Sequence, residues 1–208
     1  MKVIIGTGEV ELEGMLVLPG NARGIVAFAH GSGSSRLSPR NNYVAGILNE
    51  AGIATLLLDL LTAEEDLDYD MRFDISLLTK RLIDATSWLQ KHEGTQHLKI
   101  GYFGASTGAA AALKAASTLG KTVSAVVSRG GRPDLASPQE LAHVTAPTLL
   151  IVGGLDDIVI DLNKSAFGHL TCEKEMKIIP GATHLFEEAG TLEKAAIAAK
   201  EWFRPRLA

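Results

Sequence analysis

From Gly24 onward the sequence alternates between short apolar runs and longer segments in which apolar residues recur at helical spacing. The apolar runs are nearly continuous, which is typical of strands that are covered by helices on both faces of a sheet. The connections between them are short, as in the strand–helix–strand crossovers of a parallel sheet. The sequence therefore predicts an α/β fold with a mostly parallel sheet and helices on both faces.

Eight strands are expected. The first two are Lys2–Ile5 and Glu9–Leu18, whose alternating apolar and polar residues on either side of Gly6-Thr7-Gly8 predict an antiparallel hairpin at one edge of the sheet. The other strands are expected at Gly24–Ala29, Ile53–Leu58, Leu98–Phe103, Val123–Val127, Thr148–Val152 and Glu175–Ile179. Helices are expected at Asn41–Ala51, Asp74–His92, Ser106–Leu119, Ser137–His143, Leu162–Leu170 and Leu192–Phe203, the last ending before Pro205.

The composition favours a globular protein that binds neither nucleic acid nor membranes. With 208 residues, 46% of them hydrophobic, the chain is expected to form a single domain over residues 1–208. The net charge of −4 gives no basic surface for nucleic acid, and no apolar run approaches the roughly 20 residues of a membrane helix. One cysteine, Cys172, and the absence of a signal-peptide pattern predict a cytoplasmic location. The sequence carries no signal for an oligomeric state.

The stretch Gly104-Ala105-Ser106-Thr107-Gly108 lies between a predicted strand and a predicted helix. In this context G-x-S-x-G is the pattern of a nucleophile elbow, a tight turn that presents a serine hydroxyl at the carboxyl edge of a sheet. The flanking glycines leave room for the turn to pass close to its neighbours. Ser106 is therefore the candidate nucleophile.

Two later strand ends carry the residue types that would activate such a serine. His184 follows the last predicted strand and would serve as the general base. Two carboxylates, Asp156 and Asp157, follow the strand before it, and either could orient the histidine. We prefer Asp156 because it has the D-x-x-V spacing with Val159. In open α/β sheets, ligands bind at the carboxyl ends of the strands, so these residues are expected to meet there.

The loop His30-Gly31-Ser32-Gly33 follows the first buried strand. Acyl transfer needs donors for the developing oxyanion, and the backbone amides of Ser32 and Thr107 are the candidates. His30 is a candidate substrate-binding residue at the start of the same loop. No group of His, Cys, Asp and Glu has metal-ligand spacing, and no cofactor is expected.

These motifs, together with Gly153-Gly154-Leu155-Asp156 and Gly181-Ala182-Thr183-His184, resemble those of α/β-hydrolases and, within that group, of the dienelactone hydrolase family. The resemblance implies the α/β-hydrolase fold, a catalytic triad and no metal or organic cofactor. One departure matters: dienelactone hydrolases proper carry cysteine in the elbow, and this chain has Ser106. The segments Val127–Pro133 and His30–Asn41 are also similar to hydrolase-like domains that are joined, in other proteins, to phosphoribosyltransferases.

Arg129 and Arg132 follow a predicted strand and suggest recognition of an anionic substrate, the alternative being an ion pair with Asp134 or an acidic loop residue. Tyr69, in the acidic loop Thr62–Arg72, is expected to turn toward the site. No cap insertion is present, so the site is expected to be shallow.

The sequence thus predicts a serine hydrolase that cleaves a small ester, lactone or thioester. The alternatives are an acyltransferase and a non-catalytic module that binds a ligand or partner through the same crevice.

Overall fold

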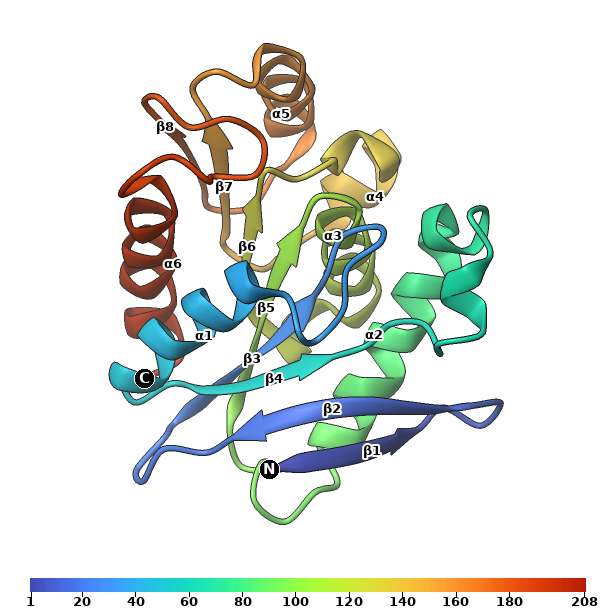
Figure 1. Ribbon diagram of the computed structural model, residues 1–208. Helices are drawn as coiled ribbons and strands as arrows, with labels where there is room; N and C mark the ends of the chain where they lie inside the picture. The colour runs from blue at the N-terminus through green and yellow to red at the C-terminus, as the bar shows by residue number, and fades with distance from the viewer.

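The structure is a computed structural model that describes residues 1–208. It contains one eight-stranded sheet with the strand order β1-β2-β4-β3-β5-β6-β7-β8 (Figure 1). The strands are β1 Lys2–Gly6, β2 Glu11–Val17, β3 Gly24–Ala29, β4 Ala54–Leu58, β5 Lys99–Ala105, β6 Val123–Arg129, β7 Thr148–Gly153 and β8 Lys174–Ile179.

Antiparallel pairing is confined to the edge that contains β2. This strand pairs antiparallel with both β1 and β4, whereas all other neighbouring strands are parallel. The expected edge hairpin and mostly parallel sheet are therefore confirmed. Every residue of β3 and β4 is buried, which is why these strands read as continuous apolar runs rather than as alternating ones.

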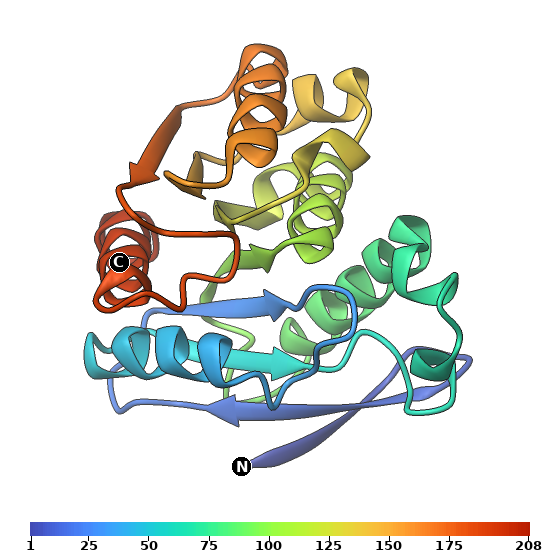
Figure 2. The ribbon, with the colours of Figure 1, turned by 45° about the horizontal axis from the view of Figure 1, so that its top comes forward.

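Helices cover both faces of the sheet. They are α1 Pro39–Glu50, α2 Ile75–Leu89, α3 Thr107–Leu119, α4 Pro138–His143, α5 Asp157–His169 and α6 Thr191–Arg206. Figures 1 and 2 show α1 and α6 side by side on one face and α2 and α3 on the other. Each layer has its own core. On one face, Phe28 and Phe103 of the sheet share a cluster with Phe203 of α6. On the other face, Tyr102 shares a cluster with Leu82 of α2 and Leu113 of α3. No helix is both long and apolar enough to span a bilayer.

Several helix boundaries differ from the expected ones, and the start of α5 and the end of α6 are two of the larger differences. α5 begins at Asp157, ahead of the expected Leu162. The earlier start was not predicted because Ile158 in the first turn is 77% exposed and breaks the apolar periodicity. α6 continues to Arg206 and includes Pro205 in its last turn, where the missing amide costs one intrahelical bond and Leu207 still donates to the Phe203 carbonyl at 2.9 Å.

The loop between β4 and α2 is ordered by two short 3₁₀ turns, Glu65–Leu67 and Met71–Phe73. The buried Arg81 of α2 donates to Glu65 Oε1 at 2.9 Å and also to the Thr7 hydroxyl in the turn between β1 and β2. Arg81 therefore ties the edge hairpin and the acidic loop to α2.

Candidate active site

Ser106 occupies the junction of β5 and α3 in a strained backbone conformation, with φ 51° and ψ −122°. A non-glycine residue at positive φ costs about 1–3 kcal/mol and persists only where its surroundings impose it. Here the Ser106 amide donates to the Arg129 carbonyl at 3.3 Å, and the Ser106 carbonyl accepts from the Arg132 amide at 3.0 Å. Bonds to the end of β6 thus hold the turn in place.

The turn also depends on two close approaches of backbone. A methyl group on Gly108 would overlap the carbonyl oxygens of Ala29 and His30, and one on Gly31 would lie 3.0 Å from Ser106 Cβ. The glycines therefore let the loop after β3 lie directly beside Ser106. Of the two glycines predicted to flank the elbow, Gly108 has this role, whereas Gly104 lies against α3, where a methyl group would come within 2.4 Å of Ala109 Cα.

His184 and Asp156 come from the loops after β8 and β7. His184 Nδ1 lies 2.7 Å from Asp156 Oδ2, so the imidazole donates from Nδ1 and keeps Nε2 free. Asp156 stands at the N-cap position of α5, yet its side chain makes no capping bond because it is turned to His184. Asp157 is exposed in the first turn of the same helix. Of the two candidate carboxylates, Asp156 is thus the one that contacts His184.

Ser106 and His184 line one cavity of about 230 Å³ at the carboxyl edge of the sheet. Gly130, at positive φ just after β6, lies under His184, since a methyl group there would come within 3.7 Å of His184 Cε1. The cavity wall also includes Gly31, Ser32, Ser34, Ser38, Arg40, Asn41, Ala105, Arg129 and Leu185. The structure therefore brings the candidate nucleophile, base and orienting acid together from three separate strand ends.

The amide of Ser32 does not point freely into this cavity. It donates to Thr107 Oγ1 at 2.9 Å, so the hydroxyl of Thr107 already occupies the expected oxyanion donor. Thr107 itself is the first residue of α3, where amides lack an intrahelical acceptor. Of the two expected donors, the Ser32 amide is therefore already engaged, and the Thr107 side chain has a role in holding the loop that the sequence pattern did not indicate.

His30 is placed differently from the expectation that it binds substrate. Its Nε2 accepts from the Leu60 amide at 2.9 Å, and its Nδ1 donates to the Gly31 carbonyl at 2.9 Å. Both ring nitrogens are thus used by backbone, and the side chain is buried. Burial lowers the pKa of His30 below its usual range, which keeps the ring neutral. His30 fixes the loop after β3 against the end of β4 and has no nitrogen left for a substrate.

Two further substrate-binding candidates lie outside the cavity. Arg132 makes a bidentate ion pair with Asp134, with both contacts at 2.8 Å. This pair is the alternative to substrate recognition that the sequence left open for Arg132. Tyr69 is 68% exposed and packs on Phe73, with ring centroids 5.0 Å apart. The 3₁₀ turns of the acidic loop turn Tyr69 outward instead of toward the site. Neither prediction holds in the structure.

Arg129 is the predicted substrate-binding residue that does line the cavity. It is 7% exposed, and no carboxylate pairs with it. Its Nη2 donates to Asn41 Oδ1 at 3.4 Å, whereas Nε and Nη1 have no hydrogen-bond partner. The guanidinium carbon lies 5.7 Å from the Phe186 ring centroid and 6.0 Å from that of Phe103. Burial, with a smaller contribution from Arg40, lowers the pKa of Arg129 to about 10.

Sequence reasoning missed the contribution of α1 to the cavity. Arg40 and Asn41, in the first turn of α1, both line it, and Asn41 is 2% exposed. A signal was present: Asn41 begins the stripe Asn41, Val44, Ala45 and Leu48, all buried, and is its only polar member. An amide on the apolar face of a helix needs a polar partner, which here is Arg129.

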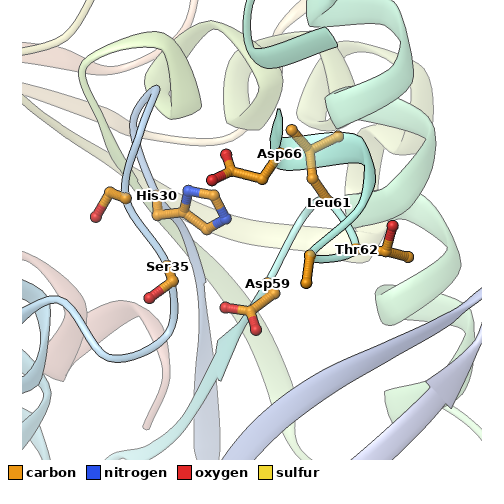
Figure 3. Close-up of a pocket in the computed structure, with 8 residues that line it drawn as sticks. His30, Ser35, Asp59, Leu61, Thr62 and Asp66 are labelled. Carbon is orange, nitrogen blue, oxygen red and sulfur yellow. The ribbon is translucent and has the colours of Figure 1, made fainter. Parts of the chain in front are cut away.

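A second cavity of about 210 Å³ lies on the other side of the His30 loop (Figure 3). Asp59 and Asp66 face it together with His30. These carboxylates are already paired, Asp59 with Arg36 and Asp66 with Arg72. No group of three or more His, Cys, Asp or Glu side chains is arranged to hold a metal ion.

By fold, the eight-stranded sheet with its two helical layers places the chain among the α/β hydrolases. The family model described as "Dienelactone hydrolase family" matches residues 12–205. The chain belongs to this family, as its motifs predict. The family and the fold are those of hydrolases.

Individual relatives agree with this assignment. A crystal structure described as dienelactone hydrolase from Anabaena variabilis is 58% identical, covers 100% of this chain and 98% of its own, and has a TM-score of 0.97. Est1E from Butyrivibrio proteoclasticus, 17% identical with 99% and 98% of the two chains covered and a TM-score of 0.84, shares the fold. Two Mycobacterium tuberculosis proteins named "Putative phosphoribosyl transferase" are 55% identical over 202 residues, which is 97% of this chain and 45% of theirs. The chain thus spans less than half the length of these curated relatives.

Proposed function

We propose that this chain is a serine hydrolase that cleaves a small ester, lactone or thioester through an acyl-enzyme on Ser106. One observation carries the proposal: the strained Ser106 and the His184 imidazole line the same cavity, and His184 is held by Asp156 at 2.7 Å. A backbone conformation that costs free energy is maintained where it serves the chemistry of a site. Ser106, His184 and Asp156 would form the catalytic triad.

In the first half of the reaction, Ser106 Oγ attacks the acyl carbon while its proton passes to His184 Nε2. Asp156 holds the imidazole and stabilises the imidazolium that forms. The Thr107 amide donates to the developing oxyanion, assisted by the Ser32 amide once its bond to the Thr107 hydroxyl is exchanged. The bond to the leaving oxygen or sulfur then breaks, and that atom takes the proton from Nε2.

In the second half, water attacks the acyl-enzyme and gives a proton to His184 Nε2. The bond between the acyl carbon and Ser106 Oγ breaks, and Oγ recovers the proton. The His184 side chain is 38% exposed, so water reaches the base directly, which favours hydrolysis over transfer to another acceptor. The cavity volume of about 230 Å³ favours a small acyl group. The match covers only 45% of the longer relatives that are named phosphoribosyl transferases, and the residues around Ser106 support hydrolysis.

Labelling with a fluorophosphonate probe tests the nucleophile. The native protein should react at Ser106, and the adduct should be absent from Ser106→Ala. Turnover of 4-nitrophenyl acetate should fall by roughly 10⁴- to 10⁶-fold in Ser106→Ala and in His184→Ala. A probe adduct that persists in Ser106→Ala would refute the assignment.

Asp156 and its neighbour Asp157 allow a matched test of the third member of the proposed triad, the carboxylate that holds His184. Asp156→Asn should lower kcat by about 10³- to 10⁴-fold, because the amide no longer holds the required imidazole tautomer. Asp157→Asn changes an exposed carboxylate in the next position and should leave kcat unchanged. Equal losses in the two variants would contradict the role given to Asp156.

A further inference from the structure

The cavity beside Ser106 contains a buried positive charge that no protein anion neutralises. Arg129 is 7% exposed, its Nε and Nη1 are unpartnered, and its one hydrogen bond is the 3.4 Å contact with a neutral amide, Asn41. Burial of a charge without a partner is costly, so such groups are rare in structures that do not use them. Nε and Nη1 are themselves buried behind the wall of the cavity that Arg129 lines, so a small shift of this side chain would bring them to an anion from outside the protein.

The other residues of the cavity wall also suit a bound anion. No Asp or Glu lines it, although the chain has an excess of acidic residues and a net charge of −4. The second cationic group of the wall is Arg40, whose partner Glu187 lies 3.1 Å away with a side chain that is 63% exposed. The neutral lining residues include the hydroxyl-bearing Ser32 and Ser34.

The neighbouring cavity of Figure 3 provides a contrast within the same molecule. Its charged residues, Asp59 and Asp66, are each paired with an arginine of this chain. That cavity therefore has no unneutralised group that calls for a ligand. Of these two cavities, only the one that contains Ser106 holds a charged residue without an ionic partner.

Arg129 is also well placed relative to the reacting atoms. It pairs in register with Ala105, the residue before Ser106, and its carbonyl accepts from the Ser106 amide. Neighbouring strands lie about 4.8 Å apart. Both residues also line the same cavity, so one small substrate could carry an anion toward Arg129 and an acyl carbon toward Ser106.

We propose that this cavity binds a phosphate-type dianion carried on the acyl part of the substrate, with Arg129 as its main ligand and Arg40 at the rim. The inference rests on the proposed function and names the class of substrate for that site. A dianion can pair with both guanidinium groups if Arg40 exchanges its exposed partner Glu187 for it, and its several oxygens, directed tetrahedrally, can use both guanidinium and hydroxyl donors. A carboxylate is planar, has two oxygens and carries one charge, so it leaves part of these guanidinium and hydroxyl donors unused.

Binding is tested without catalysis, in the Ser106→Ala protein. Inorganic phosphate is titrated by calorimetry and by thermal shift, with acetate at the same ionic strength as the comparison. Phosphate should bind and raise Tm, and acetate should do so at least tenfold more weakly. Arg129→Met in the same background should abolish the effect of phosphate without lowering Tm in phosphate-free buffer. Arg132→Met, which changes the arginine paired with Asp134 outside the cavity, should leave phosphate binding intact.

Turnover gives the second measurement, with three esters of similar length: 4-nitrophenyl 3-phosphonopropionate, mono-4-nitrophenyl succinate and 4-nitrophenyl butyrate. The phosphonate should exceed the neutral butyrate by roughly 100-fold in kcat/KM, a ratio that should fall to about one in Arg129→Met. If Arg129→Met fails to fold, Arg129→Lys replaces it and should retain only part of the preference.

The outcomes separate the two proposals. Equal turnover of all three esters by the native protein, or a preference for the succinate, would overturn the phosphate assignment while leaving the hydrolase intact. Phosphate binding that depends on Arg129, without turnover of any ester, would overturn the proposed function and leave the anion site standing. Phosphate binding that survives in Arg129→Met would show that Arg129 is not the ligand.

Discussion

At the scale of single residues, His30 shows how a titratable group can matter to a site without touching the substrate. Its neutral ring bridges the Leu60 amide and the Gly31 carbonyl. Burial holds the pKa of His30 below its usual 6.5. As pH falls below that value, the unfolded chain takes up a proton that the folded protein resists, so the folded state loses stability until the folded pKa is passed.

We therefore expect His30→Gln to reduce the loss of unfolding free energy between pH 7.5 and pH 5. Urea unfolding at the two pH values measures this loss. The exposed His97 provides the control, since His97→Gln should keep the pH dependence of the native protein. An unchanged dependence in His30→Gln would show that the acid sensitivity lies elsewhere.

The sequence indicated Ser106, Asp156 and His184 because each follows a strand in a parallel sheet, and topology alone brings such positions to one edge. It could not indicate the partners of the arginines. Arg129 and Arg132 are three positions apart in one segment, yet one is buried without a carboxylate and the other is paired with Asp134. That difference depends on the path of the chain after β6, which strand spacing does not specify.

At the scale of elements, the contact of α3 with β3 should be the most sensitive point of the fold. Gly108 faces the carbonyl of Ala29, and a methyl group there has no space. Gly108→Ala should therefore destabilise the protein by about 3 kcal/mol or more and impair turnover.

Gly46 offers a matched control inside a helix. It lies in α1, and a methyl group added to it would have no neighbour within 4 Å, so Gly46→Ala should stabilise the protein by roughly 0.5–1 kcal/mol. Urea unfolding of both variants checks the pair. A mild effect at Gly108 would mean that α3 can shift away from β3.

Element boundaries were predicted less well than element order. The start of α5 was missed because an exposed isoleucine, Ile158, obscures the helical period, and the end of α6 because Pro205 reads as a stop. Both errors arise where tertiary surroundings outweigh a local rule. The loop after β4 was expected to turn Tyr69 toward the site. It exposes Tyr69 instead and uses Glu65 in an ion pair with the buried Arg81.

At the scale of the whole molecule, Arg81 joins three parts of the chain that are distant in sequence. It contacts Thr7, Glu65 and, through α2, the core under the sheet. Removing one partner of a buried ion pair leaves the other charge uncompensated, so Glu65→Gln should cost about 2–4 kcal/mol of unfolding free energy. Glu64→Gln, one position away and exposed, should cost less than about 0.5 kcal/mol. Chemical denaturation at high and low salt measures the unfolding free energies of both variants. If the free-energy loss in Glu65→Gln depended strongly on salt, the ion pair would not be buried.

The placement of His184 after β8, the last strand, has a consequence for biosynthesis. Ser106 and the central strands leave the ribosome well before the loop that carries the imidazole, and α6, which lies beside α1, follows later still. A nascent chain therefore presents the hydroxyl long before it possesses a base. With the proposed function, esterase activity should therefore appear abruptly, and only in translation products that extend past β8; stalled or shortened chains should show none.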